Sequence, residues 1–169
     1  KCTLYKKYTS YKKCIPYLIL AGFTFFFCWW FVGRHGIFGA KVDWLSQHSV
    51  LPDYFRQQFY ATGKIFPEFA PNLGGGQNIY HFAYYGLYSP LILPSYLLPF
   101  VKMSDYIMVI SITGLTVSVL LFYYWLKSRK MDTGVAFILS LMFLLAGPMI
   151  GQYSGQIMFV DYMPFLCLA

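Results

Sequence analysis

The chain has 169 residues, of which 58% are hydrophobic and only 11% are charged. Soluble domains carry about 25% charged residues, so this chain lacks the polar surface that would keep it dissolved in water. Its net charge of +7 could suggest a nucleic-acid partner, but the basic residues flank apolar runs, as cytoplasmic membrane flanks do. Composition therefore excludes a soluble domain and nucleic-acid binding, and it predicts an all-α integral membrane protein surrounded by membrane lipid.

The N-terminal part of the chain predicts one span and a long outer loop. Residues 1–14 are basic and are expected in the cytoplasm, and residues 15–32 are apolar over one bilayer crossing. A signal peptide is the alternative, but the run ends on bulky aromatic residues and lacks a cleavage site. Residues 33–86 then form the first extracytoplasmic loop. Within it, residues 44–60 predict a partly helical segment in the membrane interface, with Pro52 as a break or a restart.

The rest of the chain predicts two further spans, assigned from proline content and charge. A stretch with three prolines is too broken to cross the membrane, and a basic cluster places the end of the next span in the cytoplasm. The predicted segments are 87–101 (re-entrant or interfacial), 105–126 (span), 127–134 (cytoplasmic loop), 135–150 (span), 151–162 (extracytoplasmic loop) and 163–169 (start of a truncated span). We expect the chain to be the N-terminal part of a longer protein and inactive alone.

The outer loop begins with a carboxylate that suits general-base chemistry. Asp43 follows the first span, and Gln47 would share its helix face at a spacing of i to i+4. A carboxylate between a membrane surface and Trp44 is partly desolvated, which raises its basicity towards a hydroxyl. The alternative is that Asp43 only caps a helix, and the two roles are compatible. His48 either assists this site or is an ordinary loop residue.

A second charged pair follows ten residues later. Arg56 is a planar donor suited to phosphate, and Asp53 lies three residues before it. The alternative is a local surface ion pair, which stabilises a protein little. Asp43 and Asp53 could share a divalent cation, although one acidic residue also suffices for a general base. The three histidines lack the spacing of a zinc site.

A glycine-rich segment with amide side chains completes the candidate site. Consecutive glycines permit backbone conformations that are closed to other residues, so this segment is either a flexible turn or a loop that shapes a sugar site. Nearby aromatic rings such as that of Tyr85 suit stacking on sugars, or they form an interfacial belt. The residues of the segment are Asn72, Gly74, Gly75, Gly76, Gln77 and Asn78.

The order of these motifs resembles the start of the bacterial YfhO family of membrane proteins. The resemblance covers nearly all of this chain but only the N-terminal part of a family member. It rests on Asp43-Trp44-Leu45-Ser46-Gln47-His48, Pro52-Asp53-Tyr54-Phe55-Arg56, Asn72-Leu73-Gly74-Gly75-Gly76-Gln77-Asn78, Phe82-Ala83-Tyr84-Tyr85, Ser89-Pro90, Gly155-Gln156-Ile157-Met158-Phe159-Val160 and Met163-Pro164-Phe165.

The resemblance implies a multi-span helical bundle of the GT-C glycosyltransferase type. Such an enzyme takes a sugar from a polyprenyl-phosphate carrier on the outer face of the cell membrane, and relatives decorate cell-wall polymers such as lipoteichoic acid. GT-C enzymes typically have a catalytic acidic residue in the first external loop, near the end of the first span. Asp43 matches that position. Where the family has Gln-Tyr, this chain has Gln47-His48, which leaves the role of position 48 open.

The rival class is a transporter or flippase for lipid-linked sugars, and a third is a non-catalytic scaffold. Broken helices and polar groups inside the membrane mark transporters. Here the polar groups concentrate in the outer loop, and the apolar stretches Tyr106–Leu126 and Val135–Ile150 carry no ionisable side chain apart from tyrosine, which disfavours a proton-coupled carrier. The later outer residues Gln152-Tyr153 and Asp161-Tyr162 could face the first loop.

Overall fold

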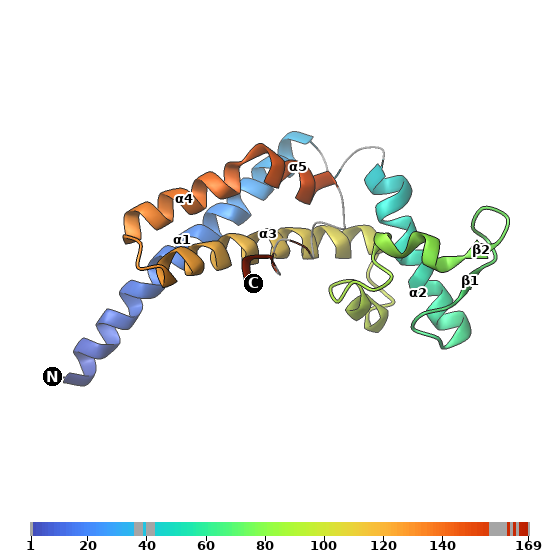
Figure 1. Cartoon of the computed structure of the whole chain (residues 1–169), viewed down its shortest axis with the longest axis horizontal. Helices are drawn as coiled ribbons and strands as arrows, with labels where there is room; N and C mark the ends of the chain where they lie inside the picture. Colours follow the sequence, from blue (N-terminus) through green and yellow to red (C-terminus); the bar gives the residue numbers. More distant parts are fainter. Residues whose placement is uncertain are drawn as a thin grey trace.

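The structure is a computed structural model in which three long helices lie side by side and a smaller module of short elements stands at one end (Figure 1). It describes residues 2–35, 39, 43–155, 162, 164 and 166–168, and it describes side chains from residue 14 on, except those of residues 35 and 152–154. The long helices are α1 (Cys2–His35), α3 (Met103–Ser128) and α4 (Thr133–Leu145). Each of the three contacts the other two.

Two of these helices are long and apolar enough to cross a membrane. The candidate spans are Cys14–Arg34, with 21 residues, and Met103–Ser128, with 26 residues. At about 1.5 Å per residue both exceed the roughly 30 Å of a bilayer core. Polar side chains inside them bond their own backbone: the Thr24 hydroxyl donates to the Leu20 carbonyl at 2.8 Å. The predicted spans at 15–32 and 105–126 coincide with these helices.

The predicted span at 135–150 is not one continuous helix. α4 ends at Leu145, Ala146 takes an extended conformation, and α5 (Gly147–Gly155) follows. Pro148 explains the break, because it has no N–H to donate and its ring clashes with the preceding turn of a helix. α4 has 13 residues, about 20 Å of helix, which is less than the thickness of a bilayer core.

The two basic segments lie at the same end of the helix bundle. α1 and α4 run in one direction and α3 runs back, so the turn from α3 to α4 lies at the end of the bundle from which the N-terminal part of α1 projects (Figure 1). In that turn Lys127 donates to the Met131 carbonyl at 2.8 Å, and the Asp132 carboxylate caps α4 by accepting from the Gly134 amide at 2.8 Å. The placement of this end in the cytoplasm stays a prediction.

The segment between the two candidate spans folds into a module with its own apolar core. Its elements are η1 (Trp44–His48), α2 (Val50–Thr62), β1 (Phe69–Ala70), β2 (Gln77–Asn78), η2 (Ile79–Tyr85) and η3 (Leu93–Leu97). Phe55 of α2, Ile79 of η2 and Leu87 are fully buried together. The two strands pair antiparallel, with Phe69 opposite Asn78. Tyr96 of the proline-broken segment packs in the same core, so loop and segment form one unit.

The predicted helix at 44–60 is present as two elements, and of the two alternatives for Pro52 the restart is the one observed. η1 is one turn of π-helix, and α2 begins directly after Ser49. Pro52 lies in the first turn of α2, where a missing backbone N–H costs nothing because that turn has no intrahelical acceptor. Along these two elements Leu51 and Phe55 are buried, whereas Leu45 is exposed.

A third apolar cluster joins the module to the bundle. Trp44 of η1 packs with Ile92 of the proline-broken segment and with Met103 and Ile107 at the start of α3. All four side chains are buried. This cluster fixes the beginning of η1, and therefore Asp43, relative to the outer end of α3.

Candidate functional site

Four predicted site residues meet where η1 faces the end of η2. The Tyr85 hydroxyl donates to the Gln47 side-chain carbonyl, and the His48 and Tyr85 rings lie 5.2 Å apart. The charge of Asp43 acts on both His48 and Tyr85, so its carboxylate lies within electrostatic range of the two rings. The structure thus brings Asp43, Gln47, His48 and Tyr85 together. The hydrogen-bonded residues Gln47 and Tyr85 are 38 residues apart in the sequence.

The Asp43 carboxylate is not used as a helix cap. Asp43 occupies the N-cap position of η1 but has helical backbone angles and makes no side-chain capping bond. A capping residue usually adopts an extended backbone, which turns its carboxylate back to the first amides. The Asp43 side chain is exposed, and the indole of Trp44 is buried against Ile92, Met103 and Ile107. Desolvation of the carboxylate by the membrane surface stays a prediction.

Tyr85 and His48 both have shifted proton affinities. Burial, a hydrogen bond to Tyr84 and the charge of Asp43 raise the pKa of Tyr85 to about 12. Burial lowers the pKa of His48, which is 4% exposed, and Asp43 partly offsets that shift. Among the described residues nothing bonds His48 Nδ1. At neutral pH Tyr85 is therefore a neutral hydrogen-bond donor and His48 an uncharged buried ring.

Acid is expected to destabilise the protein through His48. His48 in the unfolded chain binds a proton below its ordinary pKa of 6.5, whereas burial keeps the same ring unprotonated in the folded chain until a lower pH. The free energy of unfolding therefore falls as the pH drops below 6.5. Thermal unfolding in detergent at pH 7.5 and 5.5 measures this difference. His48→Gln should show a smaller loss than the original protein on going to pH 5.5. An equal loss in both would contradict the assignment.

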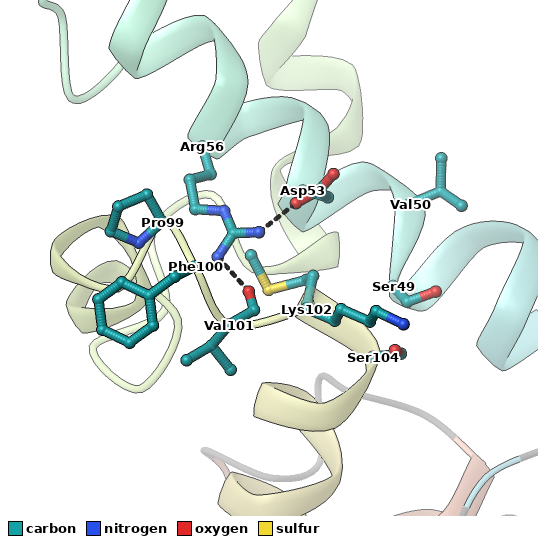
Figure 2. A pocket seen from close by; sticks show the side chains of 10 residues that line it. Ser49, Val50, Asp53, Arg56, Pro99, Phe100, Val101, Lys102 and Ser104 are labelled. Atoms are coloured by element: carbon teal, nitrogen blue, oxygen red, sulfur yellow. Dashed lines mark hydrogen bonds and ion pairs between the residues drawn. The ribbon is translucent and has the colours of Figure 1, made fainter.

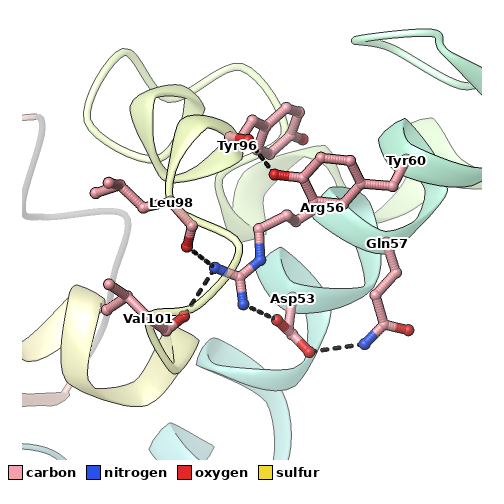
Figure 3. A network of polar contacts seen from close by, with 7 residues as sticks. All are labelled: Asp53, Arg56, Gln57, Tyr60, Tyr96, Leu98 and Val101. Atoms are coloured by element: carbon pink, nitrogen blue, oxygen red, sulfur yellow. Dashed lines mark hydrogen bonds and ion pairs between the residues drawn. The ribbon is translucent and has the colours of Figure 1, made fainter.

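Arg56 ties α2 to the proline-broken segment (Figure 3). One guanidinium nitrogen donates to the Leu98 carbonyl at 3.1 Å and to the Val101 carbonyl at 2.9 Å, and the other pairs with Asp53 at 2.5 Å. Asp53 also accepts from Gln57 at 2.8 Å. The alternative of a local Asp–Arg pair is therefore present, but the Arg56 side chain is 8% exposed and the pair is no surface pair. A phosphate ligand for Arg56 stays a prediction.

A divalent cation shared by Asp43 and Asp53 finds no further ligands. Within the part of the chain that the structure describes, no three His, Cys, Asp or Glu residues group to hold a metal ion. Asp53 already accepts from Arg56 and Gln57. The shared cation stays a prediction, and the two carboxylates have different surroundings: one is ion-paired and the other is exposed.

The glycine-rich segment is the tip of the β1–β2 hairpin. Gly74, Gly75 and Gly76 all have positive φ, at 56°, 81° and 96°, and the Gly76 amide donates to the Leu73 carbonyl at 2.9 Å. Gln77 lies in β2, and the Asn78 side chain accepts from the Tyr80 amide. The tip projects away from the start of α2, with exposed Asn72 on it (Figure 1).

The hairpin tip is thus separated from Asp43 by the length of η2. This helix begins after Asn78 and ends at Tyr85, and its seven residues span about 14 Å at roughly 2.0 Å per residue. The structure does not bring the glycines together with Asp43. A sugar-binding role for the tip stays a prediction, and the aromatic residues Tyr80 and Tyr88 stack nearer to it, with ring centroids 6.1 Å apart.

The hairpin turn should depend on Gly76 more than on Gly75. A Cβ at Gly76 would lie 2.9 Å from Cζ of Phe69, whereas one at Gly75 meets nothing within 4 Å. Both alanines pay about 1–2 kcal/mol for the left-handed conformation, and only Gly76→Ala adds the steric clash. Protease cleavage within residues 69–78 should accelerate more for Gly76→Ala. Faster cleavage of Gly75→Ala would contradict the packing.

Tyr84, which the sequence offered for sugar stacking or for an interfacial belt, lies against Tyr85 with ring centroids 4.0 Å apart. One residue beside α2 was not singled out by the sequence. Lys102 lines a cavity beside α2 and α3. In the sequence, Lys102 is a lone lysine just before the predicted span at 105–126, on the side of the membrane where the positive-inside rule expects few basic residues.

Of the predicted later residues, Asp161 and the side chains of Gln152 and Tyr153 lie outside the described part.

The family model described as "Bacterial membrane protein YfhO" matches residues 13–168 of the chain. No curated protein and no solved structure matches it. The match runs through both candidate spans, the loop module and the residues around Asp43, and of the described elements it leaves out only residues 2–12 of α1.

Proposed function

The chain belongs to the bacterial YfhO family of membrane proteins, and from this premise we propose that it is part of a membrane glycosyltransferase of the GT-C type. The donor would be a sugar on a polyprenyl-phosphate carrier, and the acceptor a cell-envelope polymer such as lipoteichoic acid. The reaction would take place at the outer face, with the N-terminus in the cytoplasm of a multi-pass protein. Family membership supports the membrane location and the glycosyltransferase-like role.

One observation carries the assignment of a base. Asp43 presents an exposed carboxylate, unused for capping, at the first element after the first span. Its charge acts on Tyr85, whose hydroxyl donates to the Gln47 side chain. A free carboxylate next to neutral polar groups can accept a proton and orient a hydroxyl, which is what attack by a sugar acceptor requires.

The proposed step moves one proton and one electron pair. The acceptor hydroxyl gives its proton to the Asp43 carboxylate while its oxygen bonds to the anomeric carbon of the donor sugar. The bond from that carbon to the carrier phosphate breaks, and the phosphate oxygen keeps the electron pair. Gln47 and His48 would bind sugar hydroxyls or the acceptor near this carbon, and the 72–78 tip would contact sugar units farther away.

Reconstitution separates transfer from transport. The full-length protein is placed in liposomes with a polyprenyl-phosphate donor that carries a radiolabelled sugar, and lipoteichoic acid is supplied outside. Radiolabel covalently attached to the polymer is the expected result. Donor that crosses the bilayer without attachment to polymer would contradict the proposal and favour a flippase. Empty liposomes give the background for both measurements.

A further inference from the structure

A cavity separates the start of α2 from the start of α3 (Figure 2). Its volume is ≈ 390 Å³, within the range of about 300–1,000 Å³ that small-molecule sites occupy. Ser49 and Asp53 line it from the α2 side, and Phe100, Lys102 and Ser104 line it from the α3 side. The cavity is therefore built by two segments some fifty residues apart, and the Arg56 contacts hold these segments together.

The lining carries more positive than negative charge. Arg56 forms the inner wall, but Asp53 balances its charge at 2.5 Å. Lys102 is exposed, and its ammonium reaches over the cavity towards the hydroxyl groups of Ser49 and Ser104 (Figure 2). None of the described carboxylates lies within ion-pair distance of Lys102, so its charge is the unbalanced one in the lining.

The outer rim of the cavity is suited to lipid. Phe100 is 81% exposed and Leu97, three residues earlier, is 80% exposed. Large apolar side chains at such exposure are unfavourable in water but not at the edge of a bilayer. A lysine beside them would lie at the level of the lipid headgroups, where its ammonium stays hydrated and meets phosphate.

We propose that this cavity binds the phosphate group of a membrane lipid. Lys102 supplies the charge, and Ser49 and Ser104 supply hydroxyl donors. The first amides of α3, which Lys102 does not cap through its side chain, add donors on the same side. The phosphate belongs to a bulk phospholipid or to a polyprenyl carrier. The site does not depend on glycosyl transfer, since binding without turnover is enough to establish it.

Lipid binding to the full-length protein tests the proposal. Native mass spectrometry of the purified protein measures the bound fraction of three probes: phosphatidylglycerol, a long-chain polyprenyl monophosphate, and diacylglycerol as the phosphate-free control. Inorganic phosphate is the competitor. Lys102→Ala should weaken binding of at least one phosphate-bearing lipid by roughly tenfold and leave diacylglycerol unchanged, because a charge-assisted hydrogen bond is lost. Lys102→Arg should restore most of the binding.

Two further variants separate binding from folding. Ser104→Asp places a carboxylate in the first turn of α3, where a negative charge stabilises the helix, yet it repels phosphate from the cavity. It should therefore lower lipid binding without lowering the melting temperature. Lys64→Ala is the matched control, because Lys64 is an exposed lysine of the same loop module with only a 3.9 Å pair to Glu68.

The probes identify the source of the phosphate. If Lys102→Ala weakens binding of polyprenyl monophosphate alone, the ligand is the carrier. If it weakens binding of phosphatidylglycerol, the ligand is the bulk lipid. Displacement of both lipids by inorganic phosphate would support the same phosphate chemistry. Phosphate-lipid binding that is equal in the original protein, Lys102→Ala and Ser104→Asp would overturn the proposal, as would equal binding of diacylglycerol.

Discussion

Asp43→Asn is expected to lower sugar transfer by about 10²–10⁴-fold, the usual contribution of a general base. The amide keeps the size and polarity of the carboxylate but cannot accept a proton from the acceptor hydroxyl. Asparagine suits the start of a helix as well as aspartate does, so η1 and the buried Trp44 should stay in place. Polymer glycosylation in cells that produce the full-length variant measures the effect.

The matched control for this variant is Glu68→Gln. Glu68 is an exposed acidic residue of the same module, and its side chain is 75% exposed. The Glu68→Gln substitution removes the same charge as Asp43→Asn and should leave sugar transfer unchanged. Polymer glycosylation that persists in Asp43→Asn at a normal protein level would rule out the base assignment. A melting temperature that falls for Asp43→Asn alone would show that its loss of activity is structural.

Arg56→Met is expected to cause the largest loss of stability, about 2–4 kcal/mol. The methionine keeps an apolar stem in the buried space, but the carbonyls of Leu98 and Val101 lose their donor and Asp53 loses its counter-ion. We expect a loss of stability in the lower part of this range, because the Asp53 side chain is 32% exposed and water can solvate its carboxylate once Arg56 is gone. At this chain length the melting temperature should fall by roughly 5–15 °C.

The response should be local to the loop module. Limited proteolysis is expected to cut near residues 98–101 first, since Arg56 holds that stretch against α2. Asp53→Asn should cost less than Arg56→Met, because the asparagine oxygen still accepts a hydrogen bond from Arg56. Lys64→Ala, which removes an exposed pair at 3.9 Å, should change the melting temperature little. Equal losses for Lys64→Ala and Arg56→Met would refute the structural role.

Elements defined by short stretches of sequence were predicted well. The spans at 15–32 and 105–126 and the helix at 44–60 depend on the apolarity and periodicity of neighbouring residues, which the sequence displays directly. The break between α4 and α5 was missed because apolarity was averaged over the whole run, whereas a single proline decides whether the helix continues.

The candidate site was predicted as a set of residues but not as an arrangement. Asp43, Gln47, His48 and Tyr85 were all candidates, and the tertiary structure brings them together. The same reasoning grouped the glycine tip with them, because both lie in one loop and carry polar residues. η2 separates the tip from Asp43, and its length and direction follow from packing of Ile79 and Tyr85 in the module core.

By itself, the sequence determined that this protein lies in a membrane, which two stretches are candidate spans and which carboxylate follows the first of them, because hydropathy acts over short stretches. Only the tertiary structure decided how Arg56 is used, since its carbonyl partners lie 42 and 45 residues away. Nor could spacing show that Lys102 faces Ser49 across a cavity. Such contacts form when apolar packing brings together segments that are distant in the sequence. Patterns over short stretches of sequence do not show which of these segments will meet.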